Sequence, residues 1–130
     1  MTYAEHVDNL TSSHGISVEW KEGYFRGRAW RKQRKIKIAP VKTAVTYAIA
    51  LHEIGHVVGR QSGRRIDREV QAWEWAEENS LEWTEPMIIK AAKCVASYLK
   101  MCQRHSSMAL PPADHPAWRI SQWSEKNKER

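Results

Sequence analysis

The stretch YAIALHEIGHVVGR, residues 47–60, decides how the chain is interpreted, because it places two histidines four residues apart with a glutamate directly after the first. The apolar spacing around them is helical from about residue 43 to 58, and Gly59 is a plausible end of the helix. Residues four apart share one face of a helix, so His52 and His56 can bind a single metal ion. The stretch predicts a metal-binding helix.

Glu53 gives this predicted helix its chemistry. It is rotated by about 100° from His52, which lets its carboxylate reach a water molecule on the metal. Zinc lowers the pKa of such a water toward about 7, and a nearby carboxylate can take the proton. We therefore expect Zn2+ as cofactor and Glu53 as catalytic base. The alternative is a pair of histidines that only satisfy local hydrogen bonds on a core-facing helix.

A zinc hydrolase needs one more protein ligand. The metzincin pattern would place a histidine six residues after His56, but Ser62 stands there. A carboxylate on the next predicted helix, residues 66–80, is the simpler choice. On a helical wheel Glu69 and Glu77 fall on the apolar face, where a buried acid demands a partner. We expect Glu69 to be the ligand, with Glu77 and then Glu74 as alternatives.

The remaining pattern predicts a single α+β domain over residues 1–130. Alternation in ISVEW, YFRGRAW and KIKIA (16–20, 24–30 and 35–39) predicts a small antiparallel sheet, packed on about three helices. The third helix follows Thr84 as its cap. A proline-bearing connection is expected over 106–118, and a frayed polar end near 124–130.

Composition excludes disorder and a membrane span. The chain is 42% hydrophobic with seven tryptophans, which favours a packed core. Its longest apolar runs are far shorter than the roughly 20 residues that a bilayer requires. Cys94 and Cys102 lie about 12 Å apart along a predicted helix, too far for a disulfide, so we expect free thiols and a cytoplasmic protein.

The net charge of +6 is unevenly distributed. Between residues 21 and 42 a single acid, Glu22, stands among nine basic residues: Lys21, Arg26, Arg28, Arg31, Lys32, Arg34, Lys35, Lys37 and Lys42. Such a segment can attract nucleic acid or an acidic polypeptide. It can also be a solvated strand that uses charge for solubility and to protect a sheet edge.

The motif ALHEIGHVVG followed by REVQAWEWA resembles the small gluzincin-type metallopeptidases of phages and bacteria, including the ImmA/IrrE group, over about residues 16 to 100. The resemblance implies a zincin-like fold, zinc at His52, His56 and Glu69, and Glu53 as base. Gln71 departs from the glutamate often found there, which keeps Glu77 and Glu74 open. A bacterial or phage-infected cell is the implied setting.

The same resemblance implies that a strand beside the cleft binds an extended peptide by strand addition. Residues 24–30, with Tyr24, Arg26, Arg28 and Trp30, or residues 35–39 are the candidates, and their basic residues would favour acidic substrates.

Three functions follow from these features. The first is a zinc-dependent endopeptidase that hydrolyses a peptide bond in a protein partner. The second is a nucleic-acid-binding or regulatory module on a zincin scaffold, which the basic and aromatic segment favours. The third is a structural zinc site, in which His105, His115 or a thiolate would supply a fourth ligand. The oligomeric state is not encoded in any of these patterns, and Tyr47 and Tyr98 are only candidates for stabilising an oxyanion.

Overall fold

The computed structural model describes residues 1–105 and 109–126, and the side chains through residue 122. Its central element is α2 (Ala44–Val58), the helix expected from the histidine motif. Thr43 and Thr46 form a reciprocal cap at its start, since each hydroxyl accepts the backbone N–H of the other residue. The helix is buried on nearly every side, as expected for one that is hydrophobic almost all round.

The sheet contains β1 (Ser17–Trp20), β2 (Arg28–Trp30) and β3 (Lys35–Ile38), in the order β1-β3-β2. β2 pairs antiparallel with β3, whereas β1 pairs parallel with it. The antiparallel sheet predicted from sequence is therefore wrong in part. Residues 21–27 carry the chain past β3 to its far edge, and side-chain alternation cannot distinguish that path from a meander.

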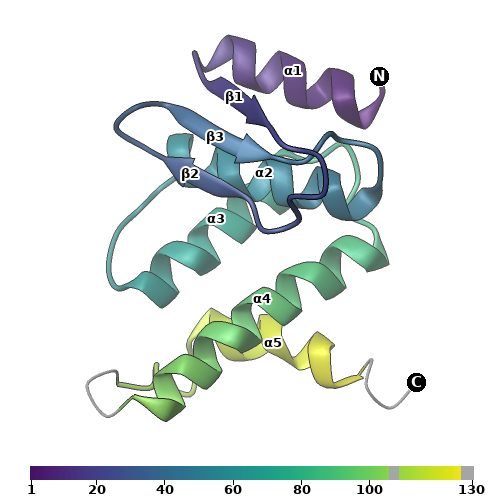
Figure 1. The fold of residues 1–130 in the computed structure, drawn as a ribbon. Coiled ribbons are helices and arrows are strands. Elements are labelled where there is room, and N and C mark those ends of the chain that lie inside the picture. Colours follow the sequence, from purple (N-terminus) through teal and green to yellow (C-terminus); the bar gives the residue numbers. More distant parts are fainter. Residues whose placement is uncertain (106–108, 127–130) are drawn as a thin grey trace.

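Alternation along β3 orients the sheet. Ile36 and Ile38 are fully buried in the core, while Lys35 and Lys37 are only partly buried on the other face. In Figure 1 the sheet lies in front of α2, and α1 lies beside β1. The sheet therefore has one face on the helices and one basic face.

The other expected helices are present as α3 (Arg65–Asn79) and α4 (Glu85–Arg104). Close packing of α3 on α2 depends on Gly55, because a Cβ there would lie 2.8 Å from the carbonyl oxygen of Ala72. Trp75 packs on this glycine. Leu81 is 46% exposed because α3 ends before it.

Two helices were not expected from the sequence. α1 (Tyr3–Ser13) packs on α2, where Tyr3 stacks on Tyr47 with ring centroids 4.2 Å apart. α5 (Pro116–Lys126) begins inside the expected proline-bearing connection and packs on α4 through buried Ala117. The described chain thus has five helices rather than about three.

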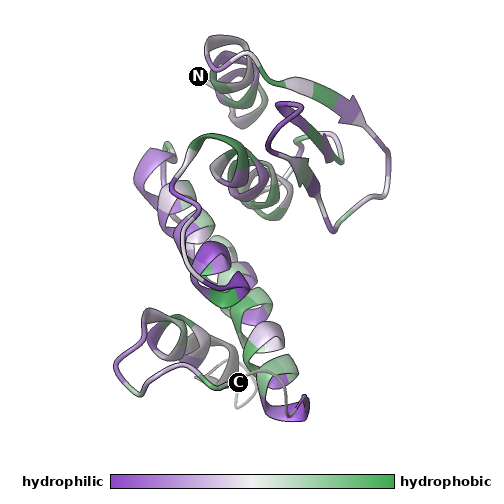
Figure 2. Ribbon diagram, turned by 90° about the vertical axis from the view of Figure 1, so that its left-hand side faces the viewer, coloured by the Kyte–Doolittle hydropathy of each residue, from purple (hydrophilic) through white to green (hydrophobic). Residues whose placement is uncertain are grey.

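The expected frayed end is only partly visible. Residues 124–126 belong to α5, and 127–130 lie outside the described residues. Figure 2 shows α1, the sheet and α2 gathered at one end, with α5 at the other end of the long α4. Over the described residues, no helix has the length and apolar character that a membrane crossing requires.

Candidate metal centre

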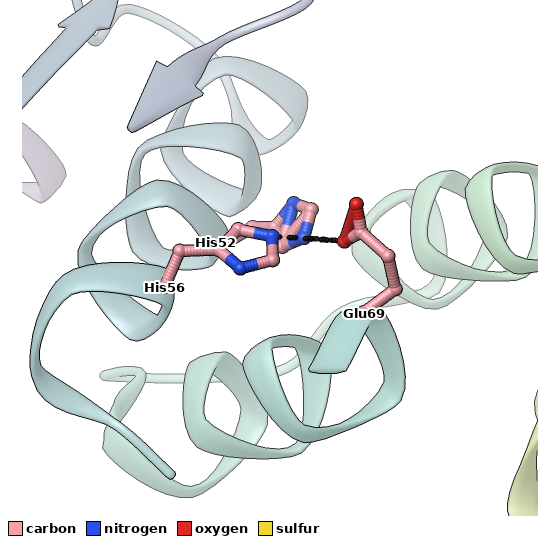
Figure 3. A group of neighbouring side chains, drawn as sticks. All are labelled: His52, His56 and Glu69. Atoms are coloured by element: carbon pink, nitrogen blue, oxygen red, sulfur yellow. Dashed lines mark hydrogen bonds and ion pairs between the residues drawn. The ribbon is translucent and has the colours of Figure 1, made fainter. Parts of the chain in front are cut away.

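Three side chains converge between α2 and α3 (Figure 3). His52 and His56 project from the last two turns of α2, and Glu69 projects from the start of α3. One carboxylate oxygen of Glu69, Oε2, lies 2.7 Å from Nε2 of His52 and 2.8 Å from Nε2 of His56. One potential ligand atom from each residue lies within 4.8 Å of the other two, so this group could hold a metal ion.

The charges of the three groups explain how they coexist in one buried cluster. Burial and the nearby His56 lower the pKa of His52 to about 3, so His52 is neutral. Burial also disfavours the charged form of His56, but its hydrogen bond to Glu69 and the carboxylate charge outweigh this and raise its pKa. Burial opposes the charge of Glu69 as well, yet both histidines hold its pKa down at about 2. Glu69 is therefore ionised and ready to act as a ligand.

Gln61 orients His56 from the loop after α2. Its side-chain oxygen lies 3.0 Å from Nδ1 of His56, which donates to it and leaves Nε2 directed at Glu69. The amide of Gln61 is anchored in turn by the carbonyl of Arg60. A hydrogen bond on the far nitrogen is the usual device that fixes the ring of a metal-ligating histidine. No pattern in the sequence distinguishes Gln61 from an ordinary loop residue.

Trp73 supports His52 from α3. The two rings stack with centroids 4.0 Å apart and planes 16° from parallel. Because Trp73 is only 2% exposed, its ring is fixed by the surrounding core, and the stack restricts the orientation of the His52 imidazole. No pattern in the sequence shows that Trp73 contacts a predicted ligand.

The hydroxyl of Tyr98 lies close to the Glu69 carboxylate. Burial and the Glu69 carboxylate raise the pKa of Tyr98 to about 12, and the hydroxyl contributes to the low pKa of Glu69. A guanidinium nitrogen of Arg65 lies 3.2 Å from that hydroxyl. The structure thus places Tyr98 at the centre, whereas Tyr47 lies under α1 and bonds His6.

Glu53 is buried, with 5% of its surface exposed. Gly27, just before β2, covers its side chain: a Cβ on this glycine would lie 2.7 Å from Cγ of Glu53 and 2.8 Å from Oε2. Gly27 also has a φ of +71°, which favours glycine. Burial raises the pKa of Glu53 to about 8, with His56 opposing and Glu69 reinforcing the shift. Without metal, Glu53 is therefore largely protonated at neutral pH.

The alternative ligands lie elsewhere. Glu74 and Glu77 line a separate hollow between α3, α4 and α5. His115 contacts Asp67 at 2.5 Å, and His105 is exposed at the end of α4. Cys94 and Cys102 are free thiols, as expected. Within residues 1–105 and 109–126, the group of potential ligands contains His52, His56 and Glu69 and no fourth histidine, cysteine or acid.

A pocket of about 330 Å³ opens onto the ligands and is lined by His56, Gln61, Arg65, Arg68 and Glu69. The centre is therefore accessible from outside, and its entrance carries two arginines. Two imidazoles and a carboxylate form a donor set typical of catalytic zinc, which keeps a further position open.

The two candidate strands for substrate binding differ in whether they have an open edge. Strand β2 is at the edge of the sheet, and Arg31 just after it donates to the carbonyls of His56 and Gly59 at 3.0 and 2.7 Å. β3 lies between two strands, so both of its edges are occupied. Strand addition at residues 35–39 is therefore excluded. Tyr24 and Arg26 precede β2 in the connection that contains Gly27.

No protein-family model, curated protein or solved structure matches this chain.

Proposed function

We propose that the chain is a zinc-dependent endopeptidase that hydrolyses a peptide bond in a protein partner. The observation that carries the proposal is the convergence of His52, His56 and Glu69 beside the buried carboxyl group of Glu53. When bound, zinc supplies a Lewis acid that polarises a carbonyl and lowers the pKa of water. The resemblance to small gluzincin-type metallopeptidases agrees with this donor set.

The ligand residues serve one purpose, which is to present preorganised donors. Gln61 and Trp73 hold the two imidazoles, so His52, His56 and Glu69 would hold zinc with little reorganisation of their side chains. A cation at that point also favours the ionised form of Glu53. Glu53 would then be able to accept the proton that peptide hydrolysis releases.

Substrate would bind along the free edge of β2, which lies beside Glu53 through Gly27 and beside the end of α2 through Arg31. An extended peptide there would gain main-chain hydrogen bonds from the edge of β2 that does not pair with β3. Arg65 and Arg68 at the pocket entrance favour a peptide with acidic side chains near the cleaved bond.

The test is cleavage of a mixed peptide library by zinc-loaded protein, detected by mass spectrometry. Glu53→Gln should reduce cleavage by at least about a hundredfold, because a general base contributes 10²–10⁴-fold. Glu77→Gln, a matched change on an exposed face of the same domain, should leave it unchanged. Cleavage that persists in Glu53→Gln, or in excess chelator, would rule out the proposal.

A second candidate function is binding of nucleic acid through the outer face of the sheet. Lys35 lies 5.0 Å from the ring centroid of Trp30, and Lys37 lies 4.9 Å from that of Tyr24, which forms a basic and aromatic surface. Glu19 neutralises part of it, at 3.1 and 3.3 Å from the two ammonium groups. A single-stranded oligonucleotide whose affinity falls steeply with salt, and falls further in Lys35→Glu, would support this function. Binding that does not depend on salt would count against it.

A further inference from the structure

The turn between β2 and β3 carries two arginines that bond to two different helices. It spans residues 31–34, and the backbone N–H of Arg34 donates to the carbonyl of Arg31 at 3.2 Å. Arg34 has a φ of +50°, a conformation that residues other than glycine adopt mainly in turns. Both arginines belong to the basic segment, but their guanidinium groups bond to backbone carbonyls at the ends of helices.

Arg31 bonds to the end of α2. One guanidinium nitrogen, Nη1, donates to the carbonyl of His56 at 3.0 Å and to that of Gly59 at 2.7 Å. The helix ends at Val58, and the carbonyls of its last four residues have no partner within the helix. A cation at this end also complements the helix dipole. Arg31 therefore completes the helix at a residue that carries a candidate metal ligand.

The second bond of Arg31 reaches the loop that orients the same ligand. Gly59 stands two residues before Gln61, whose side-chain oxygen lies 3.0 Å from Nδ1 of His56. Gly59 is tightly packed, because a Cβ there would lie 2.7 Å from the carbonyl oxygen of Gly55. Arg31 thus holds both the backbone of His56 and the start of the loop that holds its ring.

Arg34 makes the same kind of bond at a different place. Its Nε donates at 3.0 Å to the carbonyl of His14, the residue that caps the end of α1. Within the described part of the chain, no residue of α1 belongs to the metal-binding group or lines the pocket that opens onto it. The turn therefore holds two helix ends, of which only the end of α2 carries a candidate ligand.

We propose that Arg31 is a positioning residue of the metal centre, which holds His56 in the geometry that binds zinc. The role rests on the proposed function, because it requires zinc at the three candidate ligands. Arg31 directly follows β2, so one side chain joins the proposed peptide-binding edge to the ligand helix. By charge alone, a nearby guanidinium would repel a dication and weaken its binding. Positioning has the opposite sign, so zinc affinity distinguishes the two effects.

The test is zinc affinity in Arg31→Met, measured by competition with a chromophoric chelator. Methionine has an unbranched side chain without a donor, and the position is exposed. We expect zinc to bind about tenfold more weakly, at the low end of the losses that follow removal of an outer support. Arg34→Met is the matched control, since it removes the same charge and a helix-end bond from the same turn, and it should leave zinc affinity unchanged. Unchanged or tighter zinc binding in Arg31→Met, or an equal loss in Arg34→Met, would overturn the proposal.

A double-mutant cycle with Gln61→Ala separates positioning from a general loss of stability. Both side chains are argued to act on His56, so the combined loss of zinc affinity should be smaller than the product of the two single losses. Losses that simply multiply would mean that Arg31 acts independently of the support of His56, and would overturn the proposal.

A last measurement needs no metal. In chelator, the amide hydrogen of Gly59, which donates to the carbonyl of Gly55 at 2.8 Å, should exchange faster in Arg31→Met than in the wild type or Arg34→Met, because the end of α2 would fray. Equal exchange in all three would overturn the proposal. A wild type that binds zinc but cleaves nothing would refute the peptidase alone, whereas one that binds no zinc would overturn both.

Discussion

Replacing Glu53 with glutamine should stabilise the metal-free protein, although it removes the proposed base. Burial raises the pKa of this carboxyl group from 4.5 to about 8. At pH 7 the folded chain therefore retains a proton that the unfolded chain has released. Each pH unit between 4.5 and 7 costs about 1.4 kcal/mol, so the substitution should raise the free energy of unfolding by about 3 kcal/mol.

The sign of the pH dependence follows from the raised pKa. The wild-type protein has no such cost below pH 4.5, loses stability as pH rises from there to about 8, and loses no more above it. The advantage of Glu53→Gln should therefore be small at pH 4.5 and largest above pH 8. Functional residues commonly reduce stability in this way.

The assay is urea unfolding in chelator at three pH values, followed by far-ultraviolet circular dichroism. Glu77→Gln is the matched control, because an exposed acid should change stability by no more than about 0.5 kcal/mol. If Glu53→Gln is no more stable than the wild type at pH 7, or if its advantage does not grow with pH, the burial argument is refuted.

Three other predictions concern the supports of the site. Gln61→Ala should weaken zinc binding by about tenfold, measured by competition with a chromophoric chelator, because His56 loses the partner of Nδ1. Gly27→Ala should lower the free energy of unfolding in urea by about 1–3 kcal/mol, because Gly27 has a φ of +71° and a Cβ there would contact Glu53. Gly23→Ala is the control and should lower it by less, since Gly23 has a similar φ of +75° but open space around it. Equal losses in the two variants would mean that the contact with Glu53 is unimportant. Zinc affinity should fall as pH is lowered through neutrality, because the raised pKa of His56 lets protons compete with zinc for its ring nitrogen. An affinity that does not depend on pH would contradict the assignment of His56 as a zinc ligand.

The metal-binding helix and its partners could be predicted because their signals are local. The spacing of His52 and His56 fixes them on one face, and Thr43 caps the helix that bears them. The wheel also placed two acids, Glu69 and Glu77, on the apolar face of α3; Glu69 is buried, but Glu77 is exposed, so the wheel was wrong for Glu77. The wheel alone could not decide which acid is the metal ligand, because that depends on the helix that each part of α3 packs against. Glu69 contacts His52 of α2, whereas Glu77 lies at the hollow near α5.

The features that the sequence did not reveal are those that depend on distant packing. α1 buries only Val7 and Thr11, so its apolar stripe is too thin to stand out. The parallel pairing of β1 depends on the path of residues 21–27 and not on alternation. Gly27 lies against the side chain of Glu53, although the two residues are 26 positions apart in the sequence. Such contacts appear only when the chain is folded.

Zinc content measured by elemental analysis tests the central claim most directly. Wild-type protein, Glu69→Ala and Glu77→Ala would be purified side by side without chelator and then supplied with zinc. The three-ligand centre requires about one zinc per chain in the wild type and in Glu77→Ala, and much less in Glu69→Ala. No zinc in the wild type, or equal zinc in Glu69→Ala, would contradict it.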